Sequence, residues 1–190
     1  MKTLNKHDII TEQFIPQDRA KEILKVVNEL EGVWIPRGTE EITMDIDEGH
    51  FFTLGRTSYL DGPYGSTNIS LEDLNPDVKS YNDIIEHRFL DLLVHTCEFL
   101  EDTFDLGHVF WDKDIATLPG FHVFKDIPKH ALPEYHFDLH YKVLGFEGLE
   151  PDYDSVLSFT VPIELPVNST GLETIDIHWS EVDGRDYNEF

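Results

Sequence analysis

The chain contains one cysteine among 190 residues, and this scarcity limits its chemistry. Cys97 cannot form an intramolecular disulfide or a cysteine-based zinc cluster, so histidines and carboxylates are the metal ligands that the sequence offers. Its place in an apolar helical pattern predicts a core position. The sequence also lacks an apolar run long enough to span a bilayer and the apolar stretch of a signal peptide. We therefore expect a cytoplasmic protein.

Basic residues are scarce as well, since 14 Lys and Arg face 38 Asp and Glu, for a net charge of −24. A field of that sign repels phosphate backbones and anionic membranes, which disfavours nucleic acid and membrane as partners. The same field would raise the local concentration of a cationic small molecule. Acidity that serves only solubility or a saline environment is the alternative.

Two stretches keep one apolar face at helical spacing. Residues from Pro16 to Glu31 are predicted to form an amphipathic helix that supports a sheet. Ser80–Phe104 is predicted to be a second helix, with Ser80 as its N-cap and Asp83 in its first turn. Both stretches lie in residues 1–106, which we therefore expect to be mainly helical or mixed.

Strand patterns occur before and, above all, after the second helix. The candidates are Ile42–Ile46, His50–Leu60, Val109–Trp111, Ala116–Leu118, Gly120–Phe124 and Ser155–Leu165. Helices followed by successive strands predict an α+β protein whose second part, residues 107–190, is a β-sandwich or barrel with helices on one side. A chain with 40% hydrophobic residues and this length can bury one core, so we expect a single domain over residues 1–190.

The stretch Tyr135–Tyr141 carries the strongest chemical signal. Alternate side chains of an extended strand point the same way, so His136, Asp138 and His140 would project from one face. An imidazole and a carboxylate two residues apart are part of the 2-His-1-carboxylate triad that holds non-haem Fe(II) and leaves positions open. The alternative is a polar-faced strand that carries these residues without a metal.

Three segments occur in an order that resembles Fe(II)/2-oxoglutarate-dependent oxygenases. They are Leu118–Phe124 (LPGFHVF), His136–Asp138 (HFD) and Ser155–Pro166 (SVLSFTVPIELP), the last followed by Gly171–Glu173. The first segment is most similar to the branch of free-amino-acid hydroxylases and radical halogenases. The resemblance implies a double-stranded β-helix (a jelly-roll, cupin-like core) with flanking N-terminal helices. Halogenases replace the carboxylate by Gly or Ala, so the presence of Asp138 implies hydroxylation.

The resemblance also implies cofactors, namely Fe(II), 2-oxoglutarate and O2. His136, Asp138 and a distal histidine would hold the iron. Thr160 and Ser158 are the candidates for binding 2-oxoglutarate, because they would alternate inward on the strand that follows the metal strand. Hydroxyls that are satisfied within the sheet are the alternative for these two residues.

The expected substrate is a small molecule, such as a free cationic amino acid. Arg56 is the candidate for binding its α-carboxylate and Glu134 for binding a side-chain cation. His122 is the candidate for a further contact near the substrate. A surface ion pair is the alternative for Arg56, and a core histidine is the alternative for His122.

The distal histidine is the point at which the pattern departs from the family. His140 shares a strand with the other ligands and is too linear to complete a facial set, and His178 follows Asp138 sooner than is usual in the family. Three explanations stay open: a missing carboxy-terminal segment, which we favour, a separate chain that supplies it, or His178 in a shortened barrel. A homo-oligomer is also open.

This departure leaves two alternatives to a hydroxylase. The first is a non-catalytic or incomplete double-stranded β-helix binding protein that needs a C-terminal partner segment. The second is another metal-dependent enzyme on a jelly-roll fold, such as a cupin isomerase.

Overall fold

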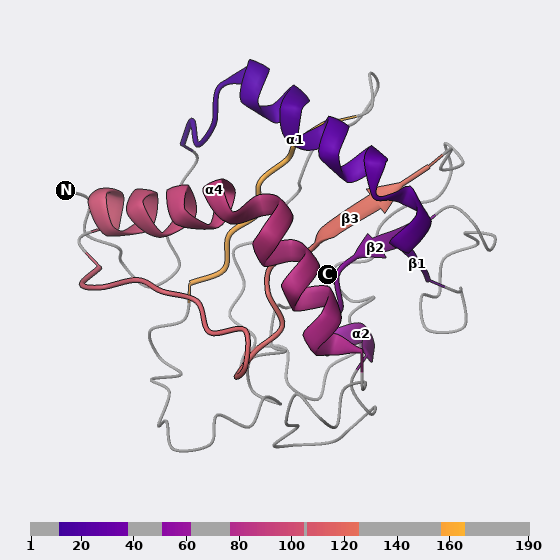
Figure 1. The fold of residues 1–190 in the computed structure, drawn as a ribbon. Helices are drawn as coiled ribbons and strands as arrows, with labels where there is room; N and C mark the ends of the chain where they lie inside the picture. Colours follow the sequence, from indigo (N-terminus) through magenta and orange to yellow (C-terminus); the bar gives the residue numbers. More distant parts are fainter. Residues whose placement is uncertain (1–11, 38–50, 62–76, 105, 126–156, 166–190) are drawn as a thin grey trace, which may run out of the picture.

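The structure is a computed structural model, and its ribbon is drawn in Figure 1. It describes residues 12–37, 51–61, 77–104, 106–125 and 157–165. In chain order the elements are α1 (Gln17–Glu29), the 3-10 helix η1 (Glu31–Val33), β1 (Ile35–Pro36), β2 (Phe51–Leu54), α2 (Ser58–Asp61), α4 (Val78–Phe104) and β3 (Phe121–Phe124). Among the helices of these described ranges, none combines the length and the apolar content that a bilayer span requires.

Helix α1 confirms the first predicted helix. It begins after Pro16, whose carbonyl accepts a hydrogen bond from the backbone N–H of Ala20 at 3.0 Å. Proline suits this position because it has no N–H to leave unsatisfied at the start of a helix. Ile23 and Val27, which are one turn apart, are buried. The apolar stripe read from the sequence is therefore the face that packs on the core.

Helix α4 confirms the second predicted helix but begins two residues earlier than predicted. The carbonyl of Asp77 accepts hydrogen bonds from the backbone N–H of Tyr81 at 3.1 Å and from the hydroxyl of Ser80 at 2.8 Å. Ser80 therefore lies within the first turn, and its prediction as the N-cap is wrong. The residues of α4 that are buried recur at helical spacing: Val78, Asn82, Ile85, Phe89, Leu93 and Leu100.

Helix α4 is also kinked. Phe89 has φ −127° and ψ 23°, outside the helical region, and Figure 1 shows the bend. The ring of Phe89 packs on that of Phe121 in β3, with centroids 4.6 Å apart. Beyond the kink, His95 Nε2 is 3.0 Å from the carbonyl of Phe14, and the ring of Phe14 packs against Phe99. The two halves of α4 thus contact different parts of the chain.

The three strands form one antiparallel sheet in the order β1-β2-β3. Strand β2 is shorter than the stretch predicted from His50 to Leu60, because Gly55 adopts a φ of 105° directly after Leu54. A positive φ is easily reached only by glycine, and it redirects the chain out of the sheet. The residues that follow form α2, so the prediction of a strand beyond Leu54 is wrong.

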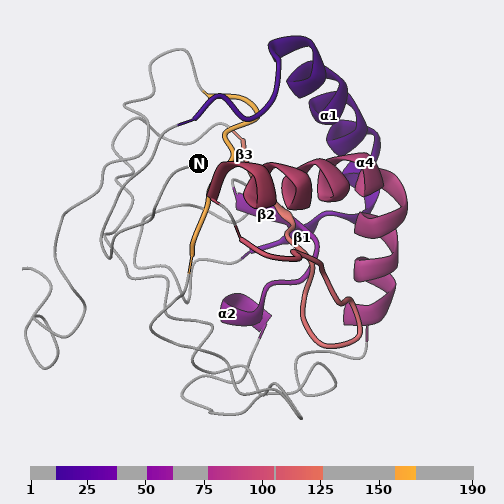
Figure 2. The ribbon, with the colours of Figure 1, turned by 90° about the vertical axis from the view of Figure 1, so that its left-hand side faces the viewer.

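The sheet has one face covered by helices, and Figure 2 shows α1 and α4 on the same side of it. Strand residues packed in or against the core on this helix-covered face are Phe52, Leu54, Phe121 and Val123. The other core residues come from both helices and the connecting segments: Ile23, Val27, Trp34, Ile85, Phe89, Leu93 and Leu118. The register places Phe51, Thr53, His122 and Phe124 on the opposite face, which we call the polar face because Thr53 binds charged side chains there.

Gly120 explains the Pro-Gly step that precedes β3. A Cβ atom at this position would lie 2.5 Å from the carbonyl oxygen of Leu54 and 3.4 Å from the Cα of Gly55. The backbones of the two segments approach so closely that no side chain fits between them. This glycine pair therefore fixes where β3 begins beside the end of β2.

Asn82 holds the loop that leads into this contact. Its side chain is 2% exposed, and its Nδ2 donates to the carbonyls of Lys113 at 2.7 Å and Ala116 at 2.9 Å. Its Oδ1 accepts from the backbone N–H of Leu118 at 2.9 Å. A buried amide with these partners fixes the loop that directly precedes Gly120 on the surface of α4.

Of the strands predicted after α4, only some are strands in the part of the chain that the structure describes. Phe121–Phe124 is a strand, as predicted, whereas Val109–Trp111 and Ala116–Leu118 lie outside strands. The backbone N–H of Val109 donates to Glu101, and Asn82 binds the backbone of Ala116 and Leu118. Residues 157–165 are also outside helices and strands, although Ile163 packs against the core. The double-stranded β-helix predicted for residues 107–190 falls mostly outside the described residues and stays a prediction.

Cys97 is half-buried on α4 rather than in the core. Burial, together with the negative charges of Glu101 and Glu98, raises the pKa of its thiol. The thiolate is therefore disfavoured, and a reactive cysteine is not indicated.

Candidate substrate-binding site

The predicted iron ligands His136, Asp138 and His178 lie outside the described residues, as does Glu134. Within the ranges that the structure does describe, no group of three or more His, Cys, Asp or Glu side chains is placed to hold a metal ion. The iron site therefore stays a prediction, and the residues with a described environment are those expected near 2-oxoglutarate and the substrate.

Ser158 and Thr160 do not alternate inward on a strand. Both are exposed, and the segment that contains them forms no strand. Pro162 and Pro166 follow these two residues, and proline lacks the N–H donor that a strand ladder needs. The geometric expectation for these two residues is wrong, while their role in binding 2-oxoglutarate stays a prediction.

His122 lies on the polar face of the sheet, in β3, opposite Thr53 of β2. Its side chain is exposed, and its ring packs edge-on against Phe51 with centroids 5.6 Å apart. The alternative of a core histidine is therefore wrong. The structure brings His122 next to the residue that anchors the charged network described below.

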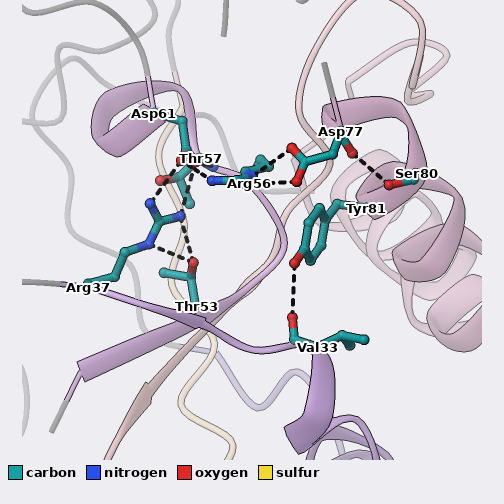
Figure 3. A network of polar contacts seen from close by, with 9 residues as sticks. All are labelled: Val33, Arg37, Thr53, Arg56, Thr57, Asp61, Asp77, Ser80 and Tyr81. Carbon is teal, nitrogen blue, oxygen red and sulfur yellow. Dashed lines mark hydrogen bonds and ion pairs between the residues drawn. The ribbon is translucent and has the colours of Figure 1, made fainter. Parts of the chain in front are cut away.

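Arg56 lies between β2 and α2, and Figure 3 shows its ion pairs. Its Nη1 donates to Oδ1 of Asp61 at 2.8 Å, while its Nε and Nη2 donate to the two carboxylate oxygens of Asp77 at 3.0 and 2.8 Å. The side chain is 15% exposed, so these pairs are more buried than the surface ion pair that was the alternative reading. Arg56 thus joins α2 to the start of α4.

Arg37, directly after β1, extends this arrangement to the sheet. Its Nε and Nη2 donate to the hydroxyl oxygen of Thr53 at 2.9 and 2.7 Å. Its Nη1 and Nη2 donate to the carboxylate of Asp61 at 2.8 and 3.0 Å. We call Thr53, Arg37, Asp61, Arg56 and Asp77 the arginine network. It reaches without interruption from the strand position opposite His122 to the start of α4.

Asp61 is the centre of the arginine network, and its side chain is 4% exposed. Desolvation acts to raise its pKa, but hydrogen bonds from Arg37, the Thr57 backbone N–H and Arg56 outweigh it and hold the pKa of Asp61 below its ordinary value. The carboxylate is therefore ionised at neutral pH, and it carries the negative charge that two largely buried guanidinium groups require.

The guanidinium of Arg56 is held by more than ion pairs. It lies over the ring of Tyr81, 5.3 Å from the centroid, and the hydroxyl of Tyr81 donates to the carbonyl of Val33 at 3.2 Å. Desolvation lowers the pKa of Arg56, yet hydrogen bonds and charge from Asp77 and Asp61 more than offset this and raise it overall. The position and the charge of Arg56 are thus both fixed.

The arginine network is suited to binding and not to proton transfer. Two arginines and two aspartates balance in charge, and a guanidinium offers paired N–H donors in the geometry of a carboxylate. Thr57 adds a side-chain oxygen that is buried and, among the described residues, has no hydrogen-bond partner. The Nε, Nη1 and Nη2 atoms of both arginines already donate to oxygens of Thr53, Asp61 or Asp77.

A shallow cavity of about 330 Å³ lies elsewhere, between α1 and α4. Its lining residues are Ile15, Pro16, Arg19, Asp91, Leu92 and His95, none of which belongs to the arginine network. Arg19 and Asp91 face each other across it at 3.5 Å. These two polar groups already pair with each other, so the cavity offers weak recognition.

Sequence reasoning missed Arg37, Asp61 and Asp77 as the surroundings of Arg56. A signal was present, because Arg37 and Arg56 are among only 14 basic residues, and Arg56 lies within the predicted strand His50–Leu60. Asn82 was missed as well, although it is a polar residue at the spacing of the apolar face of α4. A polar residue on such a face indicates a buried hydrogen-bond anchor.

Comparison of the chain with protein-family models, with curated proteins and with solved structures finds no match. The function is therefore argued from the motifs of the chain and from the geometry described above.

Proposed function

We propose that the chain is an Fe(II)/2-oxoglutarate-dependent hydroxylase-type protein of the cytoplasm that acts on a small molecule, such as a free cationic amino acid. The observation that carries the proposal is the order of Leu118–Phe124, His136–Asp138 and Ser155–Pro166 along the chain. Imidazole and carboxylate donors are a set that non-haem Fe(II) takes. The carboxylate of Asp138 favours hydroxylation over halogenation.

In this proposal His136, Asp138 and a distal histidine hold the metal, with His178 as the candidate within this sequence. Bound Fe(II) with 2-oxoglutarate and O2 would supply the oxidation of an unactivated C–H bond. Ser158 and Thr160 are the proposed contacts of 2-oxoglutarate. The task of the protein side chains is to orient the substrate and to keep water away.

The described residues support this proposal in two ways. Helices cover one face of the sheet, and on the opposite, polar face the side chain of His122 is exposed. The arginine network connects that face to Arg56 through Thr53 and Arg37. Two residues proposed near the substrate, Arg56 and His122, thereby belong to one continuous polar region.

Substrate recognition follows from these charges. Arg56 would bind the α-carboxylate, and Glu134 would bind a cationic side chain. A free amino acid with a basic side chain offers both groups, and the net charge of −24 would steer such a cation toward the protein.

The test is succinate formation by the full chain under air with Fe(II), 2-oxoglutarate and a panel of free amino acids. We expect succinate that depends on all three additions and that falls to background in His136→Ala. The matched control is His87→Ala, which removes an exposed histidine of α4 and should leave turnover unchanged. Turnover that survives in His136→Ala would rule the proposal out.

A binding protein is the second candidate, and one observation favours it. Among the described residues the arginine network binds charge but provides no proton donor or acceptor for catalysis. A non-catalytic protein of this kind would form no succinate under any condition, yet a bound amino acid would raise its Tm.

A further inference from the structure

The two edges of the Arg56 guanidinium are occupied by carboxylates that differ in burial. Asp61, on the Nη1 side, is 4% exposed, whereas Asp77, on the Nε and Nη2 edge, is 43% exposed. Asp77 makes the two-point contact that a free carboxylate would make with an arginine. The exposed position is therefore the one that a ligand can reach.

Asp61 cannot be exchanged in the same way. Its two oxygens also accept hydrogen bonds from both terminal nitrogens of Arg37, at 2.8 and 3.0 Å, and from the backbone N–H of Thr57 at 2.7 Å. A ligand that displaced it would leave two guanidinium groups without their common partner. The Asp77 carboxylate is half-exposed and has only one arginine partner among the described residues, so displacing it from Arg56 costs less than displacing Asp61.

Arg56 would stay in place if Asp77 left. Asp61 holds its Nη1, and the anchored ring of Tyr81 lies against its flat face. The Nε and Nη2 donors would then point to the space vacated by the Asp77 carboxylate, already aligned for another one. Such preorganisation reduces the entropy lost on binding.

We propose that a small carboxylate ligand binds Arg56 by displacing the Asp77 side chain from the Nε and Nη2 edge of the guanidinium. This inference rests on the proposed function only for the identity of the ligand, a free amino acid. The exchange makes binding selective, because a ligand without a carboxylate cannot compete with Asp77. It also makes Asp77 the residue that sets the affinity of the site.

Asp77→Asn is the variant that tests the exchange. It keeps the shape of the side chain but removes the charge that competes for Arg56. The start of α4 is preserved, because it is the backbone carbonyl of Asp77 that accepts from Tyr81 and Ser80. Asp18→Asn is the matched control, since Asp18 is 94% exposed, pairs with Lys21, and its change alters the net charge equally.

The measurement is the NMR signal of the Arg56 Nε–H group in the ¹⁵N-labelled full chain, assigned by its loss in Arg56→Lys and titrated with propionate. Propionamide, which has the same shape without charge, serves as the neutral probe. We expect Asp77→Asn to bind propionate about fivefold more tightly than the unmodified chain, because propionate no longer has to displace a charged carboxylate from Arg56. Asp18→Asn should match the unmodified chain, and propionamide should cause no shift.

Three results would overturn the inference: equal propionate affinity in Asp77→Asn and Asp18→Asn, no shift of the Arg56 signal in either variant, or equal binding of propionamide. If Arg56→Lys fails to fold, the comparison of the two asparagine variants still decides. The titration needs no iron, so it is separate from the proposed function. Propionate binding without succinate formation contradicts only the hydroxylase, and succinate formation without propionate binding contradicts only the exchange.

Discussion

The two faces of the small sheet are built from different chemistry. The helix-covered face carries Phe52, Leu54, Phe121 and Val123, and these pack with α1 and α4. The polar face carries Thr53 and His122 beside the stacked rings of Phe51 and Phe124, with the arginine network attached to Thr53. Adjacent residues of a strand thus serve opposite purposes, because their side chains alternate between the faces. The helix-covered face therefore contributes to the apolar core, whereas the polar face is joined through Thr53 to buried ion pairs.

The energetics of the two faces differ in kind. Burying a large apolar side chain fully stabilises a protein by roughly 1.5 to 3 kcal/mol, and neighbouring burials contribute in the same direction. In the arginine network the cost of desolvating four charges largely offsets their attraction. The network therefore adds little when complete and costs much when one member is lost, which the following variants measure.

Asp61→Asn should have the largest effect. Removing the shared carboxylate leaves Arg37 and Arg56, which are 9% and 15% exposed, without their common counter-charge. We expect a loss of about 3 to 5 kcal/mol in the free energy of unfolding, measured by urea denaturation. The control is Asp77→Asn, which should cost about 1 kcal/mol or less because Asp77 is 43% exposed. Equal losses in the two variants would contradict the asymmetry of the network.

Leu54→Ala should have a comparable or slightly smaller effect on the other face. Leu54 is fully buried and belongs to the core cluster, so truncation removes contacts and leaves a cavity. We expect a loss of about 2 to 5 kcal/mol by the same urea assay. Leu90→Ala, at a position that is 47% exposed, should change stability by about 0.5 kcal/mol or less. A small effect at Leu54 would show that the helix-covered face does not carry the fold.

Gly120→Ala tests the close contact between the end of β2 and the start of β3, which both faces of the sheet share. The added methyl would meet the carbonyl oxygen of Leu54, a backbone atom that cannot rotate away. We expect a loss of about 1 to 3 kcal/mol, read from the change in Tm by circular dichroism. Gly32→Ala, where an added Cβ meets nothing within 4 Å, is the control and should be close to neutral. The reverse ranking would disprove the close approach.

The smallest expected effect is the pH dependence of the stability that Asp61 contributes. The pKa of Asp61 is lower in the folded protein than in the unfolded chain, so this carboxyl contributes stability above its unfolded pKa and loses it as the pH falls through the folded pKa. The difference in unfolding free energy between the unmodified chain and Asp61→Asn should thus be constant near neutrality and shrink below about pH 4. Urea denaturation at several pH values measures it. A difference that grows on acidification would mean that the pKa is raised.

The sequence predicted the helices better than the polar region, and the reasons are physical. Ile23 and Val27 in α1, and Ile85 and Phe89 in α4, are apolar residues four positions apart, and all four are buried in the structure. This helical spacing is a local pattern that can be read from the sequence. The partners of Arg56 are not local, because Asp77 lies 21 positions away and meets it only when α4 is in place. Contacts of this kind depend on tertiary structure, which a pattern along the chain does not contain.

The strand predictions show the same division. Phe121–Phe124 was predicted and forms β3, whereas Ala116–Leu118 lies in a loop whose backbone bonds to the side chain of Asn82. Strand β2 ends before Gly55, which has a positive φ and lies against Gly120, a residue 65 positions later in the sequence. The predicted iron ligands lie outside the described residues, so the sequence alone supports them.

The kink of α4 has a consequence for how the protein opens. A regular helix of 27 residues would transmit motion from end to end, but the non-helical backbone of Phe89 interrupts its ladder of hydrogen bonds. The half before the kink is tied to the loop of residues 113–118 through Asn82, and the half after it is tied to Phe14 through His95. Amide hydrogen exchange should divide α4 into two separately opening units. We expect the half of α4 that contacts Arg56 to exchange its amides independently of the half that contacts Phe14.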